Sequence, residues 1–205
     1  MMTILVTGFE PFGGEALNPS WEAVRRLNGD VGDARIERLL VPTSYADSIG
    51  TVTEVIDRLR PAAVVMVGQA GGRAGLSIER VAVNCDDAQA PDNTGVLHKD
   101  APIVSQGPTA YLTTLPIKQI VAGLRSAGFP AAVSNTAGLF VCNHLFYGVL
   151  HHIVIHNLET QAGFIHVPFL SKQVVSKLGI PSMSLETMVA GLDCVVAVLT
   201  SNARP

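Results

Sequence analysis

Short apolar runs recur along the chain, and they predict buried strands because a strand covered on both faces shows no polar alternation. The clearest run spans residues 62–68, with the sequence Ala-Ala-Val-Val-Met-Val-Gly. The strands predicted from such runs cover residues 3–7, 34–41, 62–68, 131–135 and 163–167, and a further, alternating strand covers residues 76–84 around Glu79.

Between these strands, capping residues mark where helices begin. Asn18 followed by Pro19 places an N-cap before a proline at the first helical position, which predicts a helix to residue 28. Ser44 predicts a helix that Pro61 stops at residue 60, and Ser184 predicts a last helix that runs to residue 200. Two further helices are predicted at residues 115–127 and 142–156.

The alternation of strands and helices predicts a three-layer α/β/α sandwich with a largely parallel, mixed central sheet. The 205 residues, 48% of them hydrophobic, fit a single domain over residues 1–205. In such sheets, sites gather at the carboxyl ends of strands. The segments that follow predicted strands and carry polar or reactive side chains are residues 8–14, Gln69, residues 135–142 and His166.

Composition excludes several classes of function. A net charge of −3, with its basic residues scattered, gives no reason to expect a nucleic-acid partner. The first residues lack the pattern of a signal peptide, and no apolar stretch approaches the ~20 residues that span a bilayer, so we expect no membrane association. Three widely spaced cysteines are not a disulfide framework, and we expect a reduced, cytoplasmic location.

Cys142 follows a run of small polar residues and a glycine, at the start of the helix predicted for residues 142–156. The positive end of a helix dipole would lower the pKa of this thiol. His166 lies further along the chain, and a cysteine with a distant histidine is the minimal plan of a cysteine hydrolase. The alternative is a buried structural cysteine.

Glu79 places a carboxylate in an otherwise apolar, alternating segment. A carboxylate that accepts the second imidazole N–H would fix the tautomer of His166 and stabilise the imidazolium. The alternative is a surface glutamate paired with Arg80 or Arg73, since such pairs are common and weak.

Three blocks of sequence, in this order, resemble the pyrrolidone-carboxylate peptidases, also called type I pyroglutamyl peptidases. They are residues 8–14 (Gly-Phe-Glu-Pro-Phe-Gly-Gly) with residues 18–21 (Asn-Pro-Ser-Trp), residues 71–84 around Glu79, and residues 134–143 around Cys142. The resemblance implies a cysteine peptidase that removes N-terminal pyroglutamate from peptides, without a cofactor, and that assembles as a homotetramer. It implies a triad of Glu79, Cys142 and His166.

Two aromatic residues, Phe9 and Phe12, lie on one loop. One phenylalanine would be expected to turn into the core, but two on one loop fit a flat, apolar slot for a neutral lactam ring better. The resemblance adds further residues to this slot. It implies apolar walls from Phe9, Phe12, Phe140 and Val141, polar partners from Gln69 and Asn18, and completion of the wall by Thr43.

Gln89 is a departure from the resembled family, in which most members have arginine at this position. The family's arginine implies a role near the acyl carbonyl, where it would assist the oxyanion. Gln89 can donate only a neutral hydrogen bond, and charged hydrogen bonds are roughly twice as strong. One possibility is that the enzyme is less active than its relatives, and another is that a cation such as Arg73 or Lys99 supplies the missing charge at the oxyanion. The alternative is that the loop is only a rim of the pocket and that the change from arginine to Gln89 is neutral.

Other histidines and cysteines have plainer interpretations. His152 and His156 have the i, i+4 spacing of zinc ligands but lack the glutamate of H-E-x-x-H, so we expect no metal, and with His151 they should cover a helix end or a subunit contact. His144 is a rival base for Cys142, yet residues two apart on a helix face different ways. The remaining cysteines are expected to be structural, Cys194 in the core or a subunit interface and Cys85 at a strand end.

Two other functions remain open from the sequence. A nucleoside phosphorylase-like enzyme would share a similar architecture, but it needs basic or hydroxyl residues that converge on phosphate, and the sequence offers no compact set. A non-catalytic pyroglutamate-binding relative is the second alternative, and the presence of all three triad residues argues against it.

Overall fold

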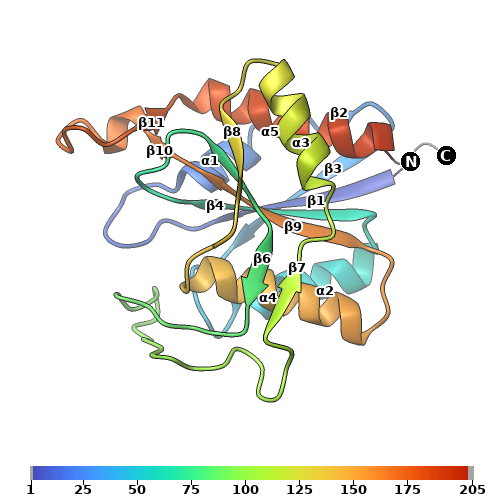
Figure 1. The fold of residues 1–205 in the computed structure, drawn as a ribbon, viewed down its shortest axis with the longest axis vertical. Helices are drawn as coiled ribbons and strands as arrows, with labels where there is room; N and C mark the ends of the chain where they lie inside the picture. Colours follow the sequence, from blue (N-terminus) through green and yellow to red (C-terminus); the bar gives the residue numbers. More distant parts are fainter. Residues whose placement is uncertain (1, 203–205) are drawn as a thin grey trace.

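The computed structural model describes residues 2–202 and places a seven-stranded sheet between two layers of helices (Figure 1). The predicted α/β/α sandwich with a largely parallel, mixed sheet is therefore confirmed. Met1 and residues 203–205 of the predicted domain lie outside the described residues. The strands are β1 (Met2–Phe9), β2 (Asp30–Val31), β3 (Ala34–Val41), β4 (Ala63–Gln69), β5 (Leu76–Glu79), β6 (Val81–Val83), β7 (Ala110–Leu112), β8 (Ala131–Ser134), β9 (Gln161–Val167), β10 (Phe169–Leu170) and β11 (Ser182–Met183).

The sheet has the order β2-β3-β1-β4-β9-β5-β8. Neighbouring strands are parallel except for β2 beside β3 and β5 beside β9, which are antiparallel. The helices are α1 (Pro19–Val24), α2 (Ser48–Leu59), α3 (Ile117–Ser126), α4 (Val141–Ile155) and α5 (Leu185–Asn202), with a short 3₁₀ turn at Ser171–Gln173. No helix in the described part of the chain is both long and apolar enough to cross a membrane.

The helices divide between the two faces of the sheet. In Figure 1, α1, α3 and α5 lie above the sheet, and α2 and α4 lie below it. Strand β4 supplies both cores, because alternate side chains of a strand point to opposite faces: Val65 and Val67 pack on the first face, Val64 and Met66 on the second. Burial on both faces explains why this strand shows a continuous apolar run.

The helix starts predicted at Asn18 and Ser184 are confirmed, since each side chain accepts a backbone N–H of its helix. Helix α1 ends at Val24, earlier than predicted. Helix α2 begins at Ser48 rather than at Ser44, because the residues between them form a turn whose Tyr45 N–H is donated to Asp92.

The predicted strand over residues 76–84 is divided at Arg80. Its first half, β5, stays in the main sheet, while its second half, β6, leaves the sheet and pairs with β7 beside α4 (Figure 1). The amide of Asn143 on α4 holds this hairpin: it accepts the N–H of Val83 and donates to the carbonyls of Val83 and Cys85. The short strands β2, β7, β10 and β11 have too few residues to show a sequence pattern.

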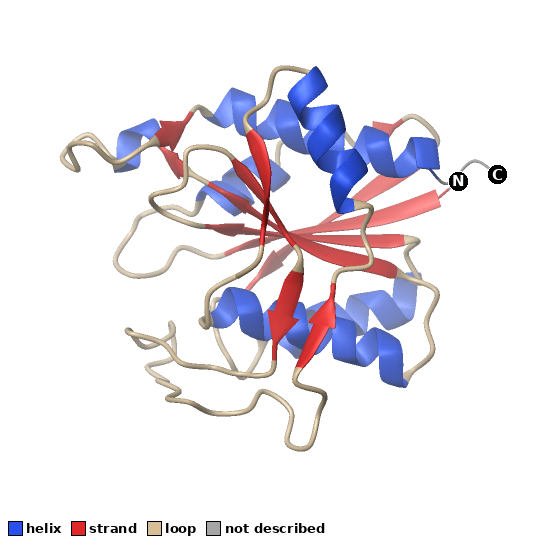
Figure 2. Cartoon of the chain, viewed as in Figure 1, coloured by secondary structure: helices blue, strands red, loops and turns tan. Residues whose placement is uncertain are grey.

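A long loop connects β6 to β7 and lies at the lower left of Figure 2. Asp92 orders this loop, because its carboxylate accepts the backbone N–H groups of Thr94 and Val96 and that of Tyr45. Asn93 then donates to the carbonyl of Pro11, 2.9 Å away. The loop is thereby tied to the aromatic loop that follows β1.

Candidate active site

Cys142 is the second residue of α4, at the end of the loop that follows β8. Gly138 allows the turn in this loop, because its φ of 76° lies in the left-handed region that side chains disfavour. Phe140 is the N-cap residue of α4 and caps it with no side-chain hydrogen bond. The first N–H groups of the helix therefore remain available beside the thiol.

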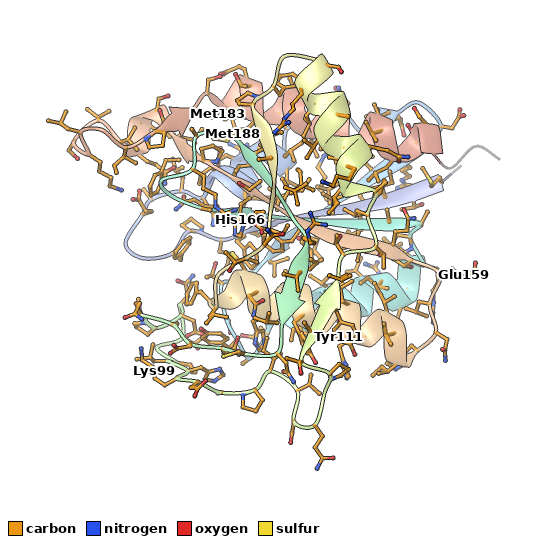
Figure 3. The ribbon with its side chains drawn as sticks, viewed as in Figure 1. Lys99, Tyr111, Glu159, His166, Met183 and Met188 are labelled. Carbon is orange, nitrogen blue, oxygen red and sulfur yellow. The ribbon has the colours of Figure 1, made fainter. Side chains whose placement is uncertain are left out.

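His166 and Glu79 form a buried pair. The Nδ1 of His166 lies 2.7 Å from the Oε1 of Glu79, and the two side chains are 4% and 0% exposed. A carboxylate accepts hydrogen bonds, so Nδ1 carries the proton and Nε2 is left as the basic nitrogen. The antiparallel pairing of β9 with β5 brings the two together, with Ser77 opposite His166. Figure 3 shows His166 near the centre of the molecule.

Gly68 brings the thiol and the histidine strand together. It lies opposite His166 in the pairing of β4 with β9. A Cβ atom on Gly68 would lie 2.9 Å from the Sγ of Cys142 and 2.8 Å from the Phe164 ring. Only glycine leaves this space, so the thiol of α4 reaches the carboxyl edge of the sheet beside His166.

Arg73 joins Glu79, His166 and Cys142 at this site, although the sequence did not predict it as part of the triad's surroundings. Its Nη1 lies 2.5 Å from the Oε1 of Glu79, and its Nη2 donates to the carbonyl of Thr136 at 2.9 Å. Glu79 is thus paired with both Arg73 and His166, but it is fully buried, so the alternative of a surface glutamate is wrong. Arg80 instead donates to Asn135.

The charges of the site fix its resting state. Burial would raise the pKa of Glu79, but hydrogen bonds from His166, Ser134 and Arg73 outweigh it and lower that pKa below its usual value. Burial lowers the pKa of His166, despite the opposing effect of Glu79. Glu79 is therefore ionised, and His166 is neutral, near pH 7.

The expected lowering of the Cys142 pKa is wrong. Burial, with the negative charge of Glu79, raises the pKa of this thiol to about 12, and Arg73 opposes the shift only in part. Withdrawal of the thiolate from water outweighs the favourable helix end. The resting pair is consequently a neutral thiol and a neutral imidazole.

A small apolar pocket opens beside Cys142. It is lined by Phe9, Phe12, Asn18, Thr43, Gln69, Phe140, Val141 and Cys142. Phe9 is buried and packs on Phe164, while Phe12 packs on Phe140 with 5.8 Å between ring centroids. The structure therefore brings together all the residues predicted for the ring slot.

Asn18 and Thr43 also stabilise the loop that follows β1. Both side chains donate to the carbonyl of Glu10, at 2.9 and 3.0 Å, which fixes the loop that carries Phe12. The Oδ1 of Asn18 also caps α1 by accepting from Ser20.

A wider depression lies at the opposite edge of the sheet, around residues 59–63 and 157–161, far along the strands from the triad.

Gln89 is exposed and does not line the pocket. Of the two cations considered for its place, Arg73 is engaged by Glu79, and Lys99 donates its Nζ to the carbonyl of Ala88, next to Gln89. Figure 3 shows Lys99 in the long loop at the lower left. Of these two cations, Lys99 is therefore the one that contacts the residue next to Gln89.

The other histidines have partners of their own. His144 lies 2.7 Å from Asp86, His151 lies 2.9 Å from the hydroxyl of Tyr111, and His152 lies 3.1 Å from Asp57. Within residues 2–202, no group of histidine, cysteine and acidic side chains is arranged to hold a metal ion. Cys85 and Cys194 are free, partly exposed thiols.

Comparison with known proteins identifies the family of this chain. The profile of the family described as "Pyroglutamyl peptidase" matches residues 2–202. The chain belongs to the pyroglutamyl peptidase family. It is 53% identical to the pyrrolidone-carboxylate peptidase of Cupriavidus taiwanensis over 98% of this chain and 94% of that protein. It is 47% identical to the enzyme of the same name from Yersinia pestis, over 97% and 93%.

Solved structures of this family have the same fold. Pyroglutamyl peptidase I of Bacillus amyloliquefaciens superposes with a TM-score of 0.95 at 44% identity, over 98% of each chain. A mutant pyrrolidone carboxyl peptidase of P. furiosus superposes with a TM-score of 0.94 at 40% identity, over 98% of this chain and 100% of that one. The family resemblance predicted from the sequence is confirmed, and neither the phosphorylase-like nor the non-catalytic alternative finds support.

Proposed function

We propose that this pyroglutamyl peptidase family member hydrolyses the amide bond that follows an N-terminal pyroglutamyl residue of a peptide. Cys142 is the nucleophile, His166 the general base and acid, and Glu79 the group that orients His166. One observation carries the proposal: His166, in a buried pair with Glu79, lies opposite Gly68, the residue against which the Cys142 sulfur rests, and Cys142 also lines a small, uncharged, apolar pocket.

The reaction proceeds through an acyl-enzyme. As the sulfur of Cys142 bonds to the pyroglutamyl carbonyl carbon, its proton passes to Nε2 of His166. Collapse of the tetrahedral intermediate breaks the C–N bond, and His166 returns the proton to the leaving amine. Water then attacks the thioester with His166 as base, releasing pyroglutamate and the thiol.

The first turn of α4 supports the oxyanion. Its N–H groups, including that of Cys142, lack a side-chain cap and lie at the positive end of the helix. Donors already in place where negative charge develops stabilise the transition state without reorganisation. The neutral resting pair requires such support, because the thiolate forms only as the attack proceeds.

The pocket suits a neutral lactam. Phe9, Phe12, Phe140 and Val141 are its apolar residues, and none of the residues that line it is charged. A peptide that begins with proline or glutamate carries charge that would be desolvated there without a partner. Cleavage of such peptides should therefore be very slow.

Location and assembly extend the proposal. Free thiols at Cys85, Cys142 and Cys194 fit a reducing compartment, and we place the enzyme in the cytoplasm. Homotetramer formation follows from the family resemblance alone. Sedimentation of the purified chain measures it directly.

A fluorogenic pyroglutamyl amide tests the reaction. Wild-type enzyme should release the fluorophore, and Cys142→Ser should lower turnover by at least about a thousandfold with the fold intact, as loss of a triad nucleophile does. Iodoacetamide should inactivate wild type, modifying Cys142 before Cys85 or Cys194. Near-normal turnover by Cys142→Ser, or comparable cleavage of a prolyl amide, would exclude the assignment.

A further inference from the structure

Asn143 follows the nucleophile on α4 and is only 1% exposed. Its Oδ1 accepts the backbone N–H of Val83 at 3.0 Å, and its Nδ2 donates to the carbonyls of Val83 and Cys85 at 2.9 and 3.0 Å. A backbone N–H can only donate and a carbonyl can only accept, so these partners fix the orientation of the amide. Asn143 thus pairs with Val83 as the backbone of a neighbouring strand would.

The strand segment that receives these bonds is held close to Glu79. Arg80 follows Glu79 directly, and its backbone N–H donates to the carbonyl of Ser134 at 2.8 Å, while its own carbonyl accepts from Thr113 at 2.9 Å. Strand β6 begins at the next residue and pairs with β7. Because the chain from Glu79 to Val83 is short and bonded along its length, the strand that carries Glu79 sets the place of Val83.

The start of α4 depends on such directional contacts. Phe140, the N-cap residue, gives the helix no side-chain hydrogen bond, and much of the helix packs through apolar side chains. Apolar packing is non-directional, so it opposes a slide of the helix along its axis less than it opposes separation from the sheet. A neighbouring contact, from His144, ends on the side chain of Asp86. The bonds of Asn143 end on the backbone of β6, which lies beside α4 in Figure 1.

We infer that Asn143 is a positioning residue, which holds the first turn of α4 in register with the strand segment that continues from Glu79. That turn carries the Cys142 thiol and the N–H groups that support the oxyanion, while Glu79 orients His166. The inference rests on the proposed function, because it concerns the geometry of that reaction. Proton transfer from the sulfur and attack on the carbonyl both need close approach, and a misplacement of about 1 Å can cost about 10²-fold in rate.

Asn84 provides a matched control, because its side chain makes the same set of bonds elsewhere. Its Oδ1 accepts the backbone N–H of Val104 at 2.9 Å, and its Nδ2 donates to the carbonyls of Val104 and Gly107 at 2.8 and 3.3 Å. These three bonds tie the end of β6 to the long loop, and none of them reaches α4. Loosening of the loop would follow from a change at either asparagine, but displacement of α4 should follow only from a change at Asn143.

Asn143→Asp tests the inference. The new side chain keeps the size and the oxygen that accepts from Val83, but it places a second oxygen where Nδ2 faced two carbonyls. We expect kcat on a pyroglutamyl amide to fall by about 10- to 100-fold, the cost of a misplaced reacting group. KM should change less, because most of the residues that line the pocket belong to elements other than α4. Alkylation of Cys142 by iodoacetamide should slow as well, since the neutral thiol must pass its proton to His166.

Asn84→Asp loses the same kind of donated bonds, so it should also lower Tm, while kcat and the alkylation rate of Cys142 stay near the wild-type values. Asn143→Ala and Asn84→Ala repeat the comparison without adding a charge. Turnover and alkylation are measured well below the lowest Tm of the set, so that unfolding does not contribute to either rate.

The outcomes are distinct. If wild type does not cleave the pyroglutamyl amide, the proposed function fails first. If wild type is active and folded Asn143→Asp keeps its kcat, or if Asn84→Asp loses kcat to the same extent, the positioning role is overturned. If Asn143→Asp does not fold, Asn143→Ala judged against Asn84→Ala decides by the same criteria.

Discussion

Two buried histidine–carboxylate pairs flank Cys142, and they differ in chemistry although their geometry is alike. His166 lies 2.7 Å from Glu79, and His144 lies 2.7 Å from Asp86, each through Nδ1. His98 and His152 also contact carboxylates, at 3.2 and 3.1 Å, so a histidine beside a carboxylate is common in this structure. The distance between histidine and carboxylate therefore does not identify the general base.

What surrounds each pair makes the difference. His166 belongs to the sheet, opposite Gly68, whose missing side chain leaves room for the Cys142 thiol. His144 follows Cys142 on α4 and turns towards Asp86 of the long loop. Tyr45, from the turn before α2, packs edge-on against His144 with 5.2 Å between ring centroids. The first pair therefore adjoins the glycine against which the Cys142 sulfur rests, and the second attaches α4 to the loop.

Matched substitutions should separate the two pairs most strongly. Asparagine can keep the N–H that the carboxylate accepts while removing Nε2. We expect His166→Asn to lower kcat/KM by about 10²- to 10⁴-fold, the usual contribution of a general base. His144→Asn should keep most of the activity and show its effect in a lower Tm, because it disturbs a buried contact.

Turnover of a pyroglutamyl amide and thermal melting of both variants provide the measurement. Iodoacetamide labelling of Cys142 should slow in His166→Asn and stay near the wild-type rate in His144→Asn. Equal losses of activity in the two folded variants would mean that His144 shares the base role, contrary to the assignment.

Gly68→Ala should break the arrangement that favours His166. Its Cβ would meet the Phe164 ring at 2.8 Å and the Cys142 sulfur at 2.9 Å, so one of them must move. Displacement of a reacting atom by about 1 Å can cost about 10²-fold in rate, and we expect a loss of that order in kcat. Gly50→Ala, where an added Cβ meets nothing within 4 Å, is the control and should retain full activity. A fully active, folded Gly68→Ala would remove the steric argument.

Most of the architecture was predictable because its signals are local. Continuous apolar runs gave the strands, and Asn18 and Ser184 gave two helix starts through their own capping hydrogen bonds. The family blocks gave the candidate triad and the pocket. The start of α2 was missed because a distant carboxylate, Asp92, holds the preceding turn.

The rest depends on contacts between segments far apart in sequence. Arg73 was visible in the block around Glu79, but nothing local shows that it binds both this carboxylate and Thr136. Asn143 adjoins Cys142, yet its role in holding Val83 needs the folded hairpin. The Cys142 pKa was predicted with the wrong sign, because the helix end is visible in the sequence and the burial of this particular thiol is not.

Arg73→Gln tests how the charge of Arg73 affects the pKa of His166 in the catalytic pair. The acid limb of kcat/KM reports protonation of His166, whose pKa is lowered by burial, so this limb should lie below pH 6.5 in wild type. Arg73 disfavours the imidazolium by repulsion. Its removal should therefore raise the His166 pKa and move the acid limb to higher pH.

Stability should respond in the same variant. The Glu79 pKa is lowered on folding, so this carboxylate stabilises the fold above its unfolded pKa and loses that contribution as pH falls through the lower folded value. Arg73→Gln should reduce the contribution and make Tm less dependent on pH in that acidic range. Arg80→Gln, which removes a neighbouring arginine bonded to Asn135, is the control. An acid limb that stays in place would show that Arg73 acts only through structure.

Gln89→Arg should have the smallest effect. Gln89 is exposed, outside the pocket lining, and follows Ala88, whose carbonyl accepts from Lys99. If the loop approaches the acyl carbonyl when substrate binds, an added charge would strengthen a hydrogen bond to the oxyanion by roughly a factor of two. We expect a rise of about two- to tenfold in kcat/KM on a pyroglutamyl amide, with Cys142 alkylation broadly unchanged.

Ala90→Arg adds the same charge one residue further along the exposed loop, and Lys99→Met removes the existing cation. If position 89 serves the oxyanion, Gln89→Arg should raise activity and Ala90→Arg should not. Lys99→Met should lower the activity of wild type more than that of Gln89→Arg, because the new arginine would replace the lost charge. Unchanged or lower kcat/KM in folded Gln89→Arg would mean that the loop is only a rim of the pocket. The catalytic difference between the Glu79–His166 pair and the Asp86–His144 pair would then depend on the triad alone.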